Sequence, residues 1–256
     1  MISIRNLTFA YRQTPVLKGV SFDLPEGGLT ALLGCNGAGK TTLFRCMLGL
    51  LPGYKGTMLL DGKEMKTYSA QQLARKIASI PQSHYPAFNY SVRDMVLMGT
   101  TQQTGMFASP GKEQRRIADE AMDRIGILPL ADRGFAQLSG GEKQLVLIAR
   151  ALAQQAKILF MDEPTSALDY GNQLRVMEQV RLLGQQGYTV ILSTHTPQHA
   201  LSFADRVLAL HDGVLLRDGK PEDVMDPGLM KTLYGVDVVF AETEFGKAIV
   251  NLHTAL

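Results

Sequence analysis

The chain has 256 residues and a formal net charge of +2, with 45% hydrophobic and 20% charged residues. This balance is ordinary for a soluble globular protein, and the length is enough for one large α/β domain or one domain with an added lobe. Such a small charge does not favour binding to nucleic acid or to an anionic lipid surface, so we expect no nucleic-acid partner.

The cysteines and the apolar segments bear on cellular location. The two cysteines, Cys35 and Cys46, form no disulfide framework, and free thiols fit a reducing cytosol. The N-terminus has no apolar segment typical of a signal peptide, and the sequence has no apolar run of about 18 residues or more. We therefore expect a chain that does not cross a membrane by itself and acts on one only through a partner.

The first part of the chain is predicted to be mainly β structure. Alternating hydrophobic residues within 1–33 predict an antiparallel β layer that leads into a buried strand at 29–33. A glycine-rich loop at 34–40 comes next, and a helix is predicted at 41–50. The segment 53–65 is predicted to be a hairpin.

The middle of the chain is predicted to be mainly helical. Ser69 is a plausible N-cap of a helix whose apolar positions include Leu73 and Ile77. A second helix is predicted at 112–125. We expect a helical subdomain, approximately 68–135, inserted into the α/β pattern.

Helices and strands alternate after Gly140, which is the pattern of a parallel α/β sheet. We expect a helix at 140–154 and buried strands at 158–161, 189–193 and 206–210. Approximately residues 213–256 are predicted to form a C-terminal extension of short strands and helices. The whole chain, 1–256, is predicted to be a single domain.

A glycine-rich motif lies between a predicted strand and a predicted helix. It matches the pattern G-x-x-x-x-G-K-[ST] and consists of Gly34, Cys35, Asn36, Gly37, Ala38, Gly39, Lys40, Thr41 and Thr42. In such a loop backbone N–H groups surround a phosphate, Lys40 reaches the β- and γ-phosphates and the Thr41 hydroxyl binds Mg²⁺. The alternative is a glycine turn that merely ends a strand, which the strand–loop–helix context disfavours.

Two acids end the apolar strand at 158–161. A carboxylate in this position is costly unless it meets a cation, so Asp162 is predicted to hold Mg²⁺ directly or through water. Glu163 is the candidate general base that polarises the attacking water. The alternative is that both acids simply begin a solvated loop. The presence of a phosphate-binding loop in the same chain disfavours this alternative.

A second possible anion-binding helix end follows Leu138. It consists of Ser139, Gly140, Gly141 and Glu142. The alternative is a capping box formed by Ser139 and Glu142, and the two interpretations are compatible. Because only one phosphate loop is present, we expect this second helix end to serve the nucleotide of a neighbouring copy.

Together these motifs resemble the ATP-binding cassette (ABC) family over essentially the whole chain. Residues 34–42 resemble Walker A, 158–162 resemble Walker B, and 138–144 resemble the family signature. The resemblance implies an α/β P-loop NTPase fold: a RecA-like parallel sheet core, an antiparallel β layer and an inserted helical subdomain. It also implies hydrolysis of ATP to ADP and phosphate, with Mg²⁺ as cofactor.

Four further residues occupy family positions. Tyr11 matches the aromatic residue that stacks on adenine, and Gln82 matches the glutamine that senses Mg²⁺ and the γ-phosphate. Asp169 matches the D-loop, and His195 matches the switch histidine that bonds the γ-phosphate. The alternatives are a strand-end tyrosine, a solvated glutamine and a structural histidine.

The resemblance further implies partners. Two copies form a head-to-tail homodimer in which each ATP lies between Walker A of one copy and the signature of the other. Residues 84–99, 219–225 and 233–236 are similar to the importers of iron-siderophores, haem and cobalamin. In such systems the dimer is held at the cytoplasmic face of the membrane by two integral-membrane permease subunits, and a separate extracytoplasmic binding protein delivers the substrate.

A permease groove is implied at four apolar or aromatic residues, Tyr85, Phe88, Tyr90 and Met95. The alternative is that they pack inside the helical subdomain. The sequence departs from the branch pattern after Gly99, where a basic residue is expected and Thr100 stands.

Other members of the family leave alternatives open. These are an importer of metal ions, an exporter, and a soluble ABC ATPase of DNA repair or of the ribosome. The last class usually carries long coiled coils or two fused cassettes, and this chain has neither. A non-catalytic scaffold would be expected to have lost Lys40, Glu163 or His195, all of which are present.

Overall fold

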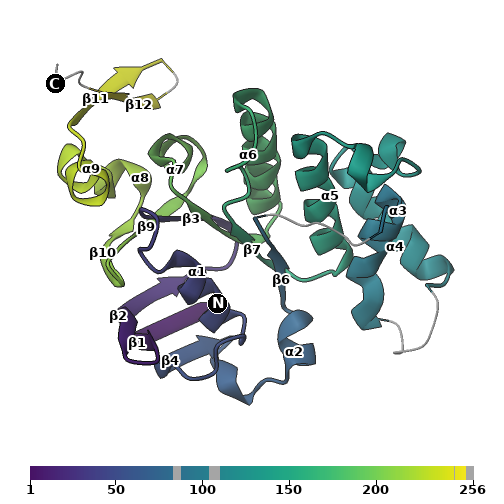
Figure 1. Cartoon of the computed structure of the whole chain (residues 1–256), viewed down its shortest axis with the longest axis horizontal. Coiled ribbons are helices and arrows are strands. Elements are labelled where there is room, and N and C mark those ends of the chain that lie inside the picture. Colours follow the sequence, from purple (N-terminus) through teal and green to yellow (C-terminus); the bar gives the residue numbers. More distant parts are fainter. Residues whose placement is uncertain (83–87, 104–109, 245, 252–256) are drawn as a thin grey trace.

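The computed structural model describes residues 1–82, 88–103, 110–244 and 246–251. In this part of the chain the strands form three sheets, and helices lie to both sides of the largest one (Figure 1). The largest sheet has the strand order β10-β9-β3-β8-β7-β6. Its strands are β3 (Gly28–Leu33), β6 (Ile77–Ile80), β7 (Ile158–Asp162), β8 (Thr189–Thr194), β9 (Arg206–His211) and β10 (Val214–Gly219).

The strands of this sheet run parallel from β9 to β6, and only β10 is antiparallel to its neighbour. The carboxyl ends of β3, β7 and β8 therefore meet at one edge, which is where ligands bind in open parallel sheets.

Side chains alternate between two cores across the parallel strands. In β3, Leu29 and Leu33 face one core, while Leu32 faces the other. In β7, Met161 faces the same core as Leu29 and Leu33, and Phe160 faces the same core as Leu32. This period of two explains why the strands read as continuous apolar runs: both faces of the sheet are covered.

One face of the sheet is covered by α1 (Lys40–Met47) and by an antiparallel sheet with the order β2-β1-β4-β5. The strands of this second sheet are β1 (Ile2–Tyr11), β2 (Thr14–Leu24), β4 (Lys55–Leu60) and β5 (Lys63–Glu64). The predicted antiparallel layer and the hairpin within 53–65 are thus confirmed. The helix predicted at 41–50 is shorter at its end, because Gly49 adopts φ 72° and stops it.

The other face is covered by helices. They are α3 (Val92–Leu97), α4 (Lys112–Arg124), α5 (Gly140–Ala153), α6 (Tyr170–Gln185) and α7 (Pro197–Phe203). Short 3-10 turns join them: η2 (Met98–Gln103), η3 (Leu128–Leu130) and η4 (Phe135–Gln137). The helix predicted at 112–125 has Ile117, Ala121 and Ile125 buried, as expected.

The helix predicted from Ser69 through Ile77 is wrong in its length. Ser69 does cap α2 (Ala70–Ala74), which follows the turn η1 (Met65–Thr67), but Ile77 begins β6. Pairing of β6 with β7 buries Ile77 in the sheet, and this tertiary contact decides against another helical turn. The predicted range of the helical subdomain, 68–135, therefore also contains a strand of the main sheet.

The C-terminal part begins with β10 and continues through α8 (Pro221–Val224) and α9 (Pro227–Tyr234) into the hairpin β11 (Val238–Thr243) and β12 (Gly246–Asn251). The hairpin is tied to α7, since the backbone N–H of Ile249 donates to Gln198 Oε1 at 3.0 Å. Figure 1 shows this part beside α7, at the end of the molecule away from α4.

Candidate nucleotide-hydrolysing site

The phosphate loop joins β3 to α1, as predicted. Gly39 has φ 105°, and a side chain there would also press on Leu17 Cδ2 at 3.1 Å. A Cβ at Gly34 would overlap the carbonyl oxygen of Leu210. Only glycine fits both positions, so the loop is fixed in shape and turns the N–H groups that begin α1 toward the carboxyl edge of the sheet.

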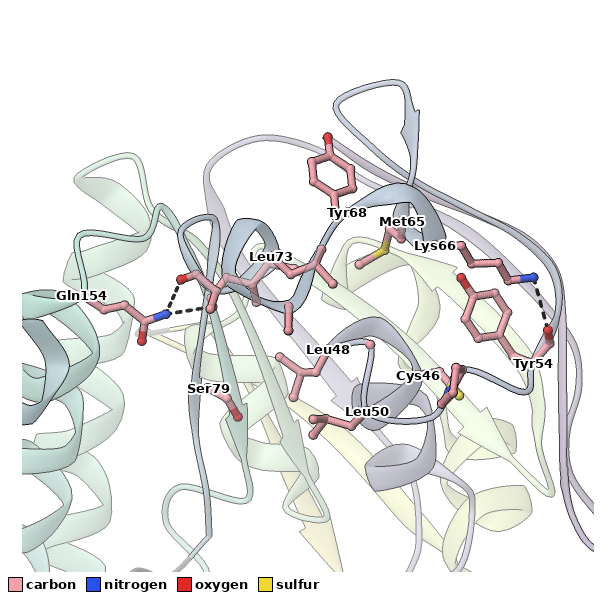
Figure 2. A pocket seen from close by; sticks show the side chains of 15 residues that line it. Cys46, Leu48, Leu50, Tyr54, Met65, Lys66, Tyr68, Leu73, Ser79 and Gln154 are labelled. Atoms are coloured by element: carbon pink, nitrogen blue, oxygen red, sulfur yellow. Dashed lines mark hydrogen bonds between the residues drawn. The ribbon is translucent and has the colours of Figure 1, made fainter. Parts of the chain in front are cut away.

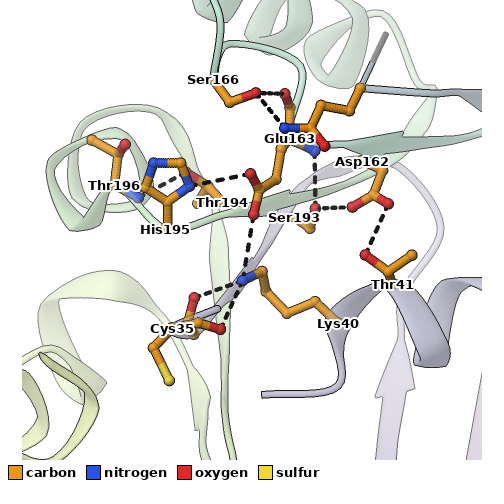
Figure 3. A network of polar contacts seen from close by, with 12 residues as sticks. Cys35, Lys40, Thr41, Asp162, Glu163, Ser166, Ser193, Thr194, His195 and Thr196 are labelled. Carbon is orange, nitrogen blue, oxygen red and sulfur yellow. Dashed lines mark hydrogen bonds and ion pairs between the residues drawn. The ribbon is translucent and has the colours of Figure 1, made fainter. Parts of the chain in front are cut away.

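Lys40 is the buried cation of this loop. Its side chain is 5% exposed, and Nζ donates to the carbonyl oxygens of Gly34 at 2.7 Å and Cys35 at 3.1 Å. Glu163 Oε1 lies 3.5 Å from the same nitrogen (Figure 3). A buried ammonium needs such partners, and all of them are oxygens that a phosphate can replace.

Thr41 and Asp162 come together from sequence positions 121 residues apart. Thr41 Oγ1 donates to Asp162 Oδ2 at 3.0 Å, while Asp162 Oδ1 accepts from Ser193 Oγ at 2.6 Å (Figure 3). The structure thus places the hydroxyl and the carboxylate that the sequence assigns to Mg²⁺ side by side.

Glu163 stands at the end of β7 in an unusual backbone conformation. Its φ of 46° lies in the left-handed region, which a glutamate adopts only when its surroundings hold it there. Its backbone N–H donates to Ser193 Oγ at 2.9 Å. The side chain is 15% exposed and lies between two bases, Lys40 on Oε1 and His195 Nδ1 at 3.3 Å from Oε2.

Ser193 is a residue of this site that sequence reasoning missed. It is fully buried at the end of β8 and joins both acids, since its hydroxyl donates to Asp162 and accepts from Glu163 N–H. A serine at the end of an otherwise apolar strand, next to the strand that carries the two acids, was the available signal.

Ser193→Ala is expected to lower ATP turnover about tenfold and to destabilise the fold by about 1–3 kcal/mol, because the buried N–H of Glu163 loses its acceptor. Steady-state hydrolysis and thermal unfolding measure the two effects. Ser202→Ala, which removes an exposed hydroxyl of α7 that bonds Gln198, is the control and should change neither. Unchanged turnover in Ser193→Ala would show that Ser193 does not position the acids.

Gln82 contacts the segment that follows Glu163 through Ser166. Its Nε2 donates to Ser166 Oγ at 2.9 Å, and Ser166 Oγ donates to the carbonyl oxygen of Glu163 at 3.2 Å. No hydrogen bond among the described residues joins Gln82 to Thr41 or Asp162 directly. The structure therefore connects Gln82 to the segment after Glu163.

The signature begins α5 as a capped helix end. Ser139 Oγ accepts from the N–H of Glu142 at 3.3 Å, and Glu142 Oε2 accepts from the N–H of Ser139 at 2.8 Å. These hydrogen bonds hold the pKa of Glu142 below its usual range. The capping box is thus present, and no hydrogen bond or ion pair among the described residues joins this helix end to the phosphate loop of the same chain.

Asp169 and Tyr11 are the remaining predicted site residues, and each is held by contacts with its near neighbours in the sequence. Asp169 caps α6 and accepts from the backbone N–H of Asn172 at 2.9 Å, which holds the pKa of the carboxyl below its usual range. Tyr11 ends β1 with 42% of its surface exposed, and its ring meets Phe9 edge to face at 4.9 Å between centroids. An exposed ring braced in this way offers a face for stacking.

The comparisons with known proteins agree with these motifs. A family model described as ABC transporter matches residues 17–166, which is more than half of the chain. The chain belongs to the ABC transporter family. An ABC transporter ATP-binding protein of Haemophilus influenzae is 44% identical over 82% of this chain and 80% of its own.

Two further relatives are similar over nearly the full length. The hemin import ATP-binding protein HmuV of Jannaschia sp. is 37% identical over 92% of this chain and 87% of its own. A solved chain from an inward-facing ABC transporter of the metal-chelate type is 32% identical, with a TM-score of 0.87 over 98% of this chain and 97% of that one. The expected ABC fold and ATP-hydrolysing activity are confirmed by this membership.

This ABC ATPase has a concave surface away from the acids. A cavity of about 800 Å³ lies between the end of α1, the η1–α2 segment and β6 (Figure 2). Its apolar lining includes Leu48, Met65 and Leu73, and Leu50 at its rim is 65% exposed. Gln154, just after α5, closes one side by donating to the carbonyl oxygens of Ala74 and Ile77.

The described residues among the four expected to form a permease groove differ in burial. Met95 is fully buried in the main core, so that prediction is wrong for Met95 and the core alternative holds. Tyr90 is half-buried against the same core, whereas Phe88 is 70% exposed. Tyr85 lies outside the described residues. No helix in the described part of the chain is long and apolar enough to cross a bilayer.

Proposed function

We propose that the chain is the ATP-hydrolysing subunit of an importer for an iron-siderophore, haem or cobalamin-type substrate. It would work beneath two permease subunits and receive substrate from an extracytoplasmic binding protein. The observation that carries the substrate class is the similarity, over about nine-tenths of the chain, to a hemin import protein and to a metal-chelate type transporter. The subunit would then lie at the cytoplasmic face of the membrane, held there by the permease.

The site supports a division of roles. Lys40 exchanges the carbonyl oxygens of Gly34 and Cys35 for the β- and γ-phosphate oxygens of ATP, and His195 turns from Glu163 to the γ-phosphate. The ring of Tyr11 stacks on the adenine.

Glu163 is then the general base. Its carboxylate takes a proton from a water whose oxygen bonds to the γ-phosphorus, while the bond from that phosphorus to the β–γ bridging oxygen breaks and ADP leaves. The left-handed backbone at Glu163, held by Ser193, aims the carboxylate at the edge where the phosphates lie. Gln82 contacts the segment after Glu163 through Ser166, whose hydroxyl donates to the carbonyl oxygen of Glu163.

The residues present fit a magnesium ion. The Thr41 hydroxyl and the Asp162 carboxylate are the hard oxygen donors that Mg²⁺ prefers, and they lie 3.0 Å apart. Gln82 would approach as a further oxygen donor. When bound, the ion neutralises charge on the phosphates.

Pairing of two copies accounts for the separate signature. The N-terminus of α5 carries backbone N–H groups and a positive dipole end, and no hydrogen bond or ion pair within the described part of the chain joins it to its own phosphate loop. In a head-to-tail homodimer, Ser139 to Glu142 of each copy would meet the γ-phosphate held by the other. Asp169 would then lie at the interface.

The cavity beside α1 is the proposed contact for the permease. It is apolar and open at Leu50, and it suits one amphipathic helix laid into a groove. It also borders Gln154, which joins α5 to the start of β6, so an occupant would touch both the helical part and the sheet that carries the acids.

Purification of the tagged chain from detergent-solubilised membranes of its native host tests this function. We expect a many-helix permease to accompany it, with ATP hydrolysis stimulated by a binding protein loaded with one iron chelate or corrinoid. Stimulation by free metal ions, or by efflux of a substrate, would replace the proposed substrate class. Recovery of ribosomes or nucleic acid without a membrane protein would overturn the transport function and leave the ATPase.

A further inference from the structure

The turn between β9 and β10 joins β2 to the phosphate loop. It consists of Asp212 and Gly213, whose φ angles of 46° and 78° are those of a two-residue hairpin turn in which both residues are left-handed. The backbone N–H of Gly213 donates to the carbonyl oxygen of Ala38 in the phosphate loop at 3.1 Å, and its carbonyl oxygen accepts from the N–H of Lys18 in β2 at 2.8 Å. One residue of the C-terminal part is therefore bonded to both segments.

The turn, β2 and the phosphate loop are in close contact at this point. A Cβ at Gly213 would lie 2.1 Å from the carbonyl oxygen of Val16 and 3.3 Å from Leu17 Cα, both in β2. A Cβ at Gly39 of the phosphate loop would lie 3.3 Å from the same carbonyl oxygen of Val16. β2 runs beside both β10 and α1, the helix that follows the phosphate loop (Figure 1). Because no side chain fits between the turn and β2, the position of β2 relative to the phosphate loop depends on the turn.

The position of β2 also determines where Tyr11 lies. Tyr11 ends β1 and pairs with Thr14 at the start of β2, and Phe9, whose ring contacts that of Tyr11, pairs with Leu17. A shift of β2 away from the phosphate loop would therefore carry the Tyr11 ring with it. An ATP molecule that stacks its adenine on Tyr11 and places its phosphates in the loop spans both parts, so its affinity depends on the distance between them.

We propose that Gly213 is a positioning residue of the nucleotide site: its two backbone hydrogen bonds and its missing side chain set the distance between the Tyr11 ring and the phosphate loop, so that one ATP reaches both. The inference rests on the stacking role proposed above for Tyr11. It gives the C-terminal extension a function in nucleotide recognition, because the turn is held in place by the pairing of β10 with β9. A ligand without a base, such as inorganic triphosphate, uses the loop alone and is insensitive to this distance.

Gly213→Ala in the full-length chain tests the proposal. The added methyl group does not fit against Val16, so it pushes β2 away from the turn. We expect the affinity for ATP to fall about fivefold, a part of what a stacked base contributes, and the affinity for inorganic triphosphate to stay at the wild-type value. Calorimetric titration with each ligand in the presence of Mg²⁺ measures both affinities.

Gly62→Ala is the matched control. Asp61 and Gly62 form the turn between β4 and β5 with φ angles of 52° and 76°, close to those of Asp212 and Gly213, but a Cβ at Gly62 would meet nothing within 4 Å. The substitution therefore imposes the same backbone strain without moving a strand. Its affinities for ATP and for triphosphate should both equal those of the wild type.

A double-mutant cycle with Tyr11→Ala gives a readout that a purely structural role would not produce. Tyr11→Ala alone should weaken ATP binding about tenfold, and adding Gly213→Ala should weaken it no further, because no stacked ring is left to displace. Unchanged ATP affinity in Tyr11→Ala would refute the stacking role itself. A loss there without a selective loss in Gly213→Ala would refute only the role of Gly213.

Lys18→Pro is the second variant, since it removes the N–H that donates to Gly213 and adds nothing to the turn. It should show the same selective loss of ATP affinity. An equal loss for ATP and triphosphate in either variant would overturn the inference, because the loop itself would then be disturbed. Failure of both variants to fold would overturn it as well, since the turn would then be required for folding rather than for spacing.

Discussion

Glu163→Gln lowers ATP turnover by about 100-fold or more while ATP binding is retained, the size of effect expected when a general base is lost. The amide keeps the shape of the side chain and its place after β7, but it cannot take a proton from water. Binding is retained because Lys40 and the phosphate loop are untouched, and Lys40 no longer has a carboxylate competing with the phosphates. Phosphate release and the binding of a fluorescent ATP analogue measure the two properties.

The control for this prediction is the same substitution at Glu178, which pairs with Arg181 on the surface of α6. Glu178→Gln should hydrolyse ATP at the wild-type rate. Turnover near wild type in Glu163→Gln would show that another group activates the water.

Lys40→Met weakens ATP binding by more than about 100-fold and abolishes turnover. Methionine keeps the length and the apolar stem of the buried side chain but cannot donate to the phosphates. Each hydrogen bond from an ammonium to a charged acceptor is worth about 1.5–3 kcal/mol, so losing two of them gives an effect of this size. Calorimetric titration with ATP measures the affinity directly.

Lys76→Met is the matched control, since Lys76 pairs with Asp61 at 2.7 Å on the surface. Its ATP affinity should equal that of the wild type. If Lys40→Met binds ATP as tightly as the wild type does, Lys40 does not contact the phosphates, and its contacts with the loop carbonyls are purely structural.

The parts of the fold that the sequence predicts best are those with local causes. The phosphate loop follows from glycines that no other residue can replace, such as Gly39 at φ 105°. The strands at 29–33 and 158–161 follow from apolar runs that reflect a sheet buried on both faces. The helix ends at Ser69 and Ser139 follow from capping chemistry within three residues.

The parts that could not be predicted depend on contacts between distant segments. Ile77 fits a helical period as well as a strand, and only pairing with β7 decides. Ser193 becomes part of the site because β8 lies beside β7. The Lys40–Glu163 pair forms only when β3, which leads into the phosphate loop, and β7, which ends at the acids, both pair with β8. The sequence alone could not show that Met95 is buried, because the residues that bury it come from helices in several parts of the chain.

The molar mass of Glu163→Gln in solution, measured with and without ATP, tests the central claim most directly. The claim is that ATP joins two copies, each supplying a phosphate loop to one nucleotide and a signature to the other. We expect the 28.0 kDa mass of a single chain without ATP and twice that mass with ATP, and no doubling when Ser139→Arg is added. A variant that binds ATP and stays at the mass of one chain, or a Ser139→Arg double variant that still doubles, would contradict the account.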